Sequence, residues 1–109
     1  MEHKNAWLAY DEPQLAELEK LATNYIDFIS ANKTERECVA TAIEQAREAG
    51  YVSLDEARAA GKQLVAGDKV YAELYGKTII LAHIGSRPMQ DGLNILGAHV
   101  DSPRLDIKQ

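Results

Sequence analysis

The strongest constraint on the fold of this chain is a change in the period of its apolar residues, which falls at Lys69. Before this residue, apolar side chains recur at spacings of three and four, as on one face of an α-helix. After it, apolar and polar side chains alternate, as in a β-strand. The sequence therefore predicts an α/β fold in which N-terminal helices precede and cover a sheet.

Two long helices are predicted in the first fifty residues. The first spans about 12–30, behind Asp11 as a candidate cap. The second begins at Thr34, which forms a capping box with Glu37, and it ends at Gly50. Both carry an apolar stripe on one face, which indicates that each helix packs against another element.

A short helix and a hairpin follow. A smaller capping box at Ser53 predicts a helix over about 55–60. Residues 69–75 alternate between two faces and predict a strand. The pair Gly76-Lys77 predicts a two-residue turn, after which the sequence TIILAHI returns as an antiparallel strand.

The last part of the chain predicts a loop and two more strands. The sequence GSRPMQDG is rich in loop-forming residues. The run 94–99 is apolar on both faces, which is typical of a central strand in a sheet covered by helices. After Pro103, the alternation over 104–108 predicts a fourth strand. The expected architecture is thus a β-hairpin followed by the first central strands of a mixed sheet.

Charge and composition exclude several partners. The 109 residues include 17 acidic and 12 basic side chains, and neither sign gathers in a block, so nucleic acid is not expected as a partner. The chain start lacks an apolar leader, and no apolar run approaches the roughly 18 residues of a membrane span. No membrane partner is therefore expected. Because Cys38 is the single cysteine, no internal disulfide can form, and a cytoplasmic location is expected.

His99 and Asp101 are the candidate site residues. In an extended chain, residues two apart project from the same face, so the carboxylate can lie beside the imidazole. A carboxylate that accepts one imidazole N–H fixes the tautomer and makes the other nitrogen a better zinc ligand. Taken alone, however, a histidine at a strand end is more often a packing residue, and an aspartate before Ser-Pro is commonly a turn former.

Longer stretches favour the site. The sequence LNILGAHVDSPRLDIKQ resembles the motif of the aspartyl aminopeptidase and aminopeptidase I family of zinc exopeptidases. KNAW near the start, NKTERECV at the second helix and GDKVYAELYGKTIILAHIG across the hairpin are similar to the same family, in the same order. The resemblance covers nearly the whole chain, which makes it specific.

The resemblance implies a metallo-aminopeptidase. By it, His99 corresponds to a metal ligand of a two-zinc site, where cobalt or manganese can substitute, and Asp101 to the catalytic carboxylate that supports this histidine. The family's other ligands and its general base have no counterpart here. Residues 1–109 therefore look like the N-terminal part of a catalytic domain, inactive alone, of an enzyme that removes acidic or neutral N-terminal residues from peptides. The predicted open strand edge also indicates a homo-oligomer.

Other polar residues are weaker candidates, and two other functions stay open. His83 is expected to be an edge or packing residue, Cys38 a buried and inert thiol, and Arg104 an exposed strand residue. The chain is alternatively a noncatalytic protein-interaction module, or part of another two-metal amide hydrolase such as an acyl-amino-acid deacylase.

Overall fold

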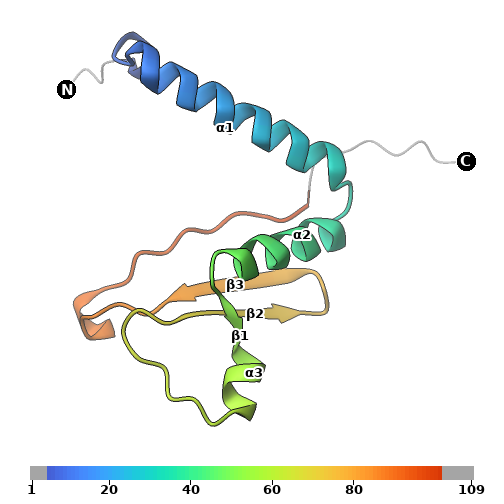
Figure 1. The fold of residues 1–109 in the computed structure, drawn as a ribbon, viewed down its shortest axis with the longest axis vertical. Coiled ribbons are helices and arrows are strands. Elements are labelled where there is room, and N and C mark those ends of the chain that lie inside the picture. Colours follow the sequence, from blue (N-terminus) through green and yellow to red (C-terminus); the bar gives the residue numbers. More distant parts are fainter. Residues whose placement is uncertain (1–4, 102–109) are drawn as a thin grey trace, which may run out of the picture. The chain divides into compact units, whose positions relative to one another are not determined.

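The computed structural model describes residues 5–101, and the chain divides into two compact units, residues 1–31 and 32–109 (Figure 1). The first unit contains a 3-10 turn, Ala6–Leu8, and helix α1, Glu12–Ala31. Asp11 caps α1 as predicted, because its carboxylate accepts from the Gln14 N–H at 2.9 Å. Trp7 packs edge-on against Tyr10 and is 62% exposed.

The second unit begins with helix α2, Glu35–Glu48. Thr34 and Glu37 form the predicted capping box, in which each side chain bonds the other residue's backbone N–H. The helix ends before Gly50, whose φ of 86° is the left-handed conformation that a glycine adopts readily. The helix therefore begins and ends where the sequence predicts.

A three-stranded mixed sheet follows, in the order β1-β2-β3. Strands β2, Lys69–Leu74, and β3, Thr78–His83, are the predicted antiparallel hairpin. The short strand β1, Val52–Ser53, was not predicted and pairs with β2 in parallel. Between β1 and β2 lies helix α3, Leu54–Ala59, close to the predicted bounds. The α/β class and the mixed sheet after the helices are confirmed.

The core lies where the two helices of the second unit meet β2. Helix α2 contacts β2 and β3, and α3 contacts β1 and β2. Val70 and Tyr71 are neighbours in β2 and are both 5% exposed, so the start of this strand is covered on both faces. The Tyr71 hydroxyl accepts from Arg47 Nε at 2.9 Å, which satisfies the polar end of a buried ring.

The hairpin turn differs from the predicted two-residue turn. The register pairs Leu74 with Thr78, so three residues form the connection. Tyr75 and Gly76 both have left-handed φ values, 55° and 64°. Side chains hold this turn, since Arg36 Nη1 donates to the Tyr75 carbonyl at 2.7 Å. This long-range bond stabilises a conformation that the local sequence does not predict.

Two further predictions are wrong, and one lies outside the described residues. Ser53 makes no side-chain capping bond to α3. Residues 94–99 form no strand, because a strand requires a hydrogen-bonded neighbour and none of residues 5–101 pairs with this run. The loop at 85–92 is confirmed. The strand predicted at 104–108 falls beyond the part of the chain that the structure describes.

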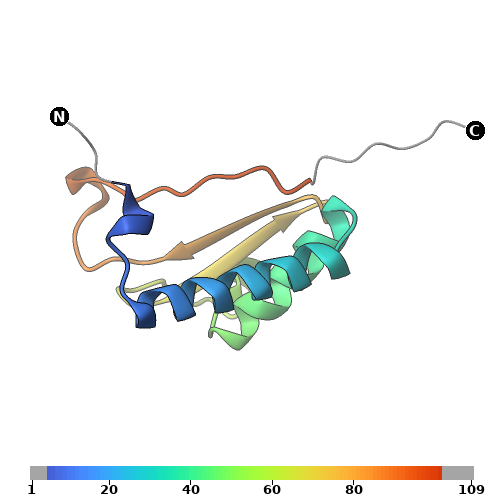
Figure 2. The same cartoon turned by 90° about the horizontal axis from the view of Figure 1, so that it is seen from above.

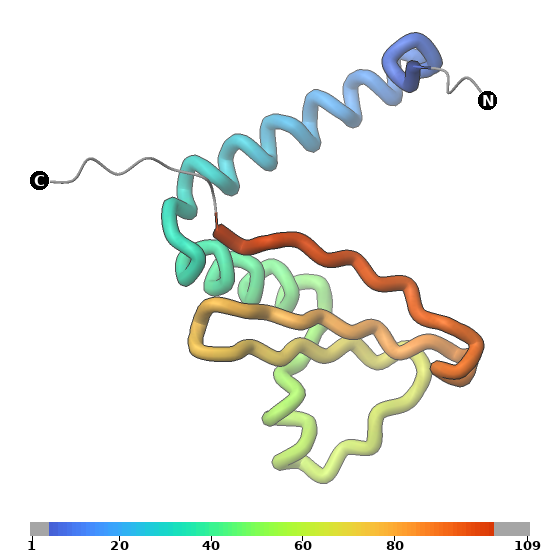
Figure 3. Tube along the Cα trace, turned by 180° about the vertical axis from the view of Figure 1, so that it is seen from behind, coloured from blue at the N-terminus to red at the C-terminus, as the bar shows by residue number. Residues whose placement is uncertain are grey.

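Residues 93–101, called here the terminal segment, run along the β3 side of the sheet without joining it (Figures 2 and 3). Most of their side chains are exposed, and Leu96 is fully so. Across residues 5–101, no helix combines the length and the apolar content that a membrane crossing requires.

Candidate functional site

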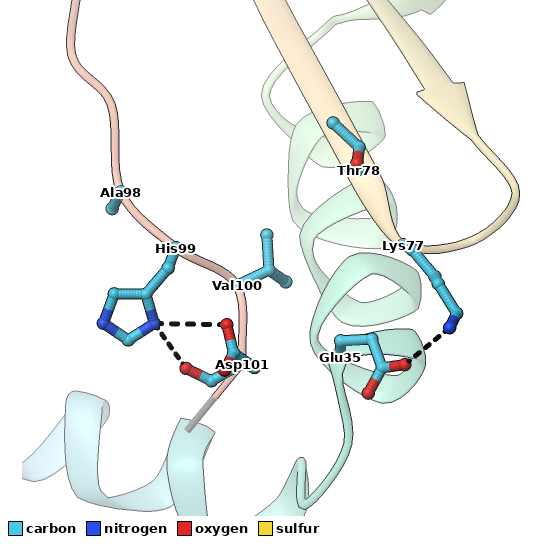
Figure 4. A pocket seen from close by; sticks show the side chains of 7 residues that line it. All are labelled: Glu35, Lys77, Thr78, Ala98, His99, Val100 and Asp101. Atoms are coloured by element: carbon cyan, nitrogen blue, oxygen red, sulfur yellow. Dashed lines mark hydrogen bonds and ion pairs between the residues drawn. The ribbon is translucent and has the colours of Figure 1, made fainter. Parts of the chain in front are cut away.

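Three parts of the second unit meet around an open hollow of about 580 Å³. Glu35, the first residue of α2, forms one side, and the hairpin contributes Lys77 and Thr78. The terminal segment closes the remaining side with Ala98, His99, Val100 and Asp101 (Figure 4). The volume lies within the roughly 300–1,000 Å³ range of small-molecule sites.

His99 and Asp101 lie together, as their spacing predicts. His99 Nδ1 is 2.6 Å from the main-chain carbonyl oxygen of Asp101 and 3.4 Å from its carboxylate Oδ1. Because both oxygens can only accept, Nδ1 must carry the hydrogen and donate it. In a neutral imidazole this leaves Nε2 unprotonated. The nearer partner is thus the backbone of Asp101, and the carboxylate is a second, longer contact.

The pair is exposed and not at the end of a buried strand. The side chains of His99 and Asp101 are 72% and 77% exposed, so Nε2 can be reached from solvent. An accessible, unprotonated imidazole nitrogen on a ring held through its other N–H is what a zinc ligand requires. The donor chemistry therefore fits one zinc ligand.

The described residues do not complete a metal centre. No group of three or more histidine, cysteine or acidic side chains is gathered within residues 5–101. A catalytic zinc usually takes about three protein ligands and keeps one position open. If His99 binds a metal ion, it would therefore need partner ligands from elsewhere.

An ion pair forms the opposite wall of the hollow, and the sequence did not point to it. Lys77 Nζ lies 3.3 Å from Glu35 Oε1. The pKa of the Glu35 carboxyl is held below its ordinary value, first by its own backbone N–H at the helix start and then by the Lys77 ammonium. The two residues are 42 positions apart in the chain, so only the packing of α2 near the hairpin turn brings them together.

The weaker candidates lie elsewhere. Cys38 is buried within α2, as predicted. His83 is exposed and pairs with Lys69 at the end of β3 opposite the turn. Arg104 lies outside the described residues. Of the predicted site residues, the hollow thus contains His99 and Asp101.

Comparison with known proteins places the chain in a family. Residues 28–109 match the sequence model of the aminopeptidase I zinc metalloproteases (M18). The chain is 50% identical, over 108 residues, to a probable M18 family aminopeptidase 1 of Clostridium acetobutylicum, covering 99% of this chain and 23% of that protein. It is 36% identical to a probable M18 family aminopeptidase 1 of Borreliella burgdorferi strain B31, with the same two coverages.

A solved structure gives the same result. The crystal structure of aminopeptidase I from Borrelia burgdorferi B31 matches 93% of this chain and 24% of its own chain, with a TM-score of 0.80 and 34% identity. The fold and the matched sequence thus agree on one class, the zinc metalloproteases. The chain belongs to the M18 aminopeptidase family, and it spans 23% of the length of the first curated relatives that it matches.

Proposed function

We propose that this chain is the N-terminal part of the catalytic domain of a zinc-dependent aminopeptidase, with His99 as a metal ligand and Asp101 as its supporting residue. The observation that carries the proposal is the His99–Asp101 contact, which leaves Nε2 free for a metal ion. Membership of the M18 family supports the same function. The relatives named above are aminopeptidases, which favours this activity over acyl-amino-acid deacylation.

The chain's own contribution is to hold and orient one ligand. His99 would bind zinc through Nε2, while the two Asp101 oxygens keep the hydrogen on Nδ1 and fix the plane of the ring. A bound zinc polarises the scissile carbonyl and lowers the pKa of a water molecule. The complete enzyme would hold two zinc ions, which cobalt or manganese can replace. Its substrates would be peptides with acidic or neutral N-terminal residues.

Two properties of the whole protein belong to the same proposal. The exposed apolar side chains Ile80, Ile95 and Leu96 support a homo-oligomer, because burying them against a second chain would remove apolar surface from water. Light scattering should give at least twice the mass of one chain, and a monodisperse monomer at high concentration would contradict this. The single reduced cysteine supports a cytoplasmic location.

Metal content and activity test the function. We expect His99→Ala to lower the bound zinc of the complete enzyme and abolish hydrolysis of aminoacyl amides, whereas His83→Ala, a histidine away from the hollow, should change neither. Asp101→Asn should reduce activity about 10- to 100-fold, the usual scale for partners of metal ligands. Full activity in both site variants would contradict the proposal.

The isolated chain provides a second test. We expect no turnover from residues 1–109 at any zinc or cobalt concentration, because the described residues contain no group of three or more side chains that could hold a metal ion. Hydrolysis that survives repurification and disappears in His99→Ala would show that this chain holds a sufficient site by itself.

A further inference from the structure

Val100 differs from every residue around it in the terminal segment. From Gly92 to His99 each residue is exposed, and so is Asp101, but Val100 is half-buried. The same segment makes no backbone hydrogen bond to another described residue. Val100 lines the hollow together with Lys77 and Thr78, so its half-burial is the feature that relates this end of the segment to the rest of the second unit.

The direction of Val100 is opposite to that of His99. In Figure 4, Val100 points toward the hairpin and α2, whereas the His99 ring points away from them. The chain bends at Val100 and Asp101, and His99 directly precedes this bend. Because one planar peptide unit joins the two residues, fixing the Val100 side chain limits the directions in which the His99 ring can project.

The surface that receives Val100 is held by bonds between two elements. Lys77 pairs with Glu35 at 3.3 Å, and Arg36 donates to the Tyr75 carbonyl at 2.7 Å. These contacts fasten the hairpin turn to the first turn of α2. Val100 thus lines a hollow whose other two sides are linked to each other, and such a hollow can define a position for it.

We infer that Val100 is a positioning residue, whose side chain anchors the terminal segment in the hollow between α2 and the hairpin turn and so determines how His99 and Asp101 are presented. The effect on metal binding rests on the function proposed above. The anchoring itself does not, since it concerns the metal-free chain.

The first test needs no metal. In the wild-type chain, nitrogen-15 NMR of His99 should show one tautomer with the hydrogen on Nδ1, and the Val100 methyls should give contacts to Thr78. Val100→Ala should produce a mixture of tautomers, while Val100→Ile should restore the single one. The matched control is Leu96→Ala, which removes a fully exposed apolar side chain from the same segment and should change nothing.

The second test follows zinc. The apparent zinc dissociation constant of the complete enzyme should rise about tenfold in Val100→Ala and stay unchanged in Leu96→Ala. If His99→Ala leaves the zinc content of the complete enzyme unchanged, the proposed function fails, and the tautomer and the methyl contacts still decide the anchoring.

Two results would overturn the inference. One is a His99 tautomer in Val100→Ala identical to that of the wild type. The other is an absence of contacts between the Val100 methyls and Thr78 in the wild-type chain, which can be judged even if Val100→Ala does not fold. The amide signals of β2 and β3 report whether each variant keeps its fold.

Discussion

Strand β3 and the terminal segment are both apolar runs that the sequence predicts as strands, yet only β3 pairs in the described structure. All six residues of β3 face partners in β2, from His83 opposite Lys69 to Thr78 opposite Leu74. Residues 94–99 pair with none of the described residues. Apolar composition and β-propensity therefore do not decide whether a run becomes a strand, because a hydrogen-bonding partner must also be present.

The connection to the partner explains the difference. Three residues join β2 to β3, so closing the hairpin costs little conformational entropy. The terminal segment follows a longer loop, and no short turn joins it to any strand among residues 5–101. The residues of β2 and β3 are thus sufficient to specify their own pairing. Whether the terminal segment forms a strand depends on residues outside the segment.

The largest expected difference between the two regions lies in core side chains. Tyr71→Ala in β2 should lower the free energy of unfolding by about 3 kcal/mol, because it removes a ring that is 5% exposed. Ile95→Ala in the terminal segment, where the side chain is 80% exposed, should change it by about 0.5 kcal/mol or less. Urea unfolding followed by circular dichroism measures both, and equal losses would remove the distinction between the regions.

A smaller difference is expected between two glycines. Gly76→Ala should destabilise the chain by roughly 1–2 kcal/mol, since its φ is 64° and the added Cβ would lie 3.2 Å from Arg36 Nη1. Gly97→Ala in the terminal segment meets no atom within 4 Å and has no positive φ, so we expect almost no change. The same urea experiment compares them, and a Gly97→Ala loss as large as that of Gly76→Ala would indicate that the segment is packed.

The smallest expected effect is a dependence on pH at the hairpin turn. The lowered pKa of Glu35 means that its ionised carboxylate, held first by its own backbone N–H and then by Lys77, stabilises the folded chain at pH values above the carboxyl's ordinary pKa. This contribution is lost as the pH falls through the lowered value. Amide exchange at Gly76 should therefore speed up in acid relative to the intrinsic rate, and Glu35→Gln should remove this change.

A second carboxyl, that of Asp68, also responds to acid, so the Glu35→Gln variant is needed to separate the two effects. The pKa of Asp68 is also lowered, first by the Lys62 ammonium and then by the Val65 N–H, so acid weakens the loop before β2 as well. If Gly76 in Glu35→Gln responds to acid as it does in the wild type, the ion pair of the hollow is not the cause.

Features that depend on neighbouring residues could be predicted from the sequence, whereas features that depend on distant residues could not. The caps at Asp11 and Thr34, both long helices and the strands of the hairpin rest on residues within a few positions of one another. The turn length depends on Arg36, 39 positions from Tyr75, and β1 is defined by pairing Val52 with Val70. No local pattern contains such contacts.

The candidate site divides in the same way. The spacing of two predicts the closeness of His99 and Asp101, although the chain bends at Val100 and Asp101 and is not an extended strand there. The ion pair of Glu35 and Lys77 and the half-burial of Val100 depend on how α2, the hairpin and the terminal segment lie together. They became visible in the folded chain.

The exposure of Trp7 has a practical consequence for fluorescence. It is the only tryptophan of the sequence, it belongs to the first unit, and it is already 62% exposed in the folded chain. An indole in contact with water emits at long wavelengths before any denaturant is added. Tryptophan emission will therefore change little when the sheet of the second unit unfolds, and a flat fluorescence trace would not mean that the chain resists denaturation.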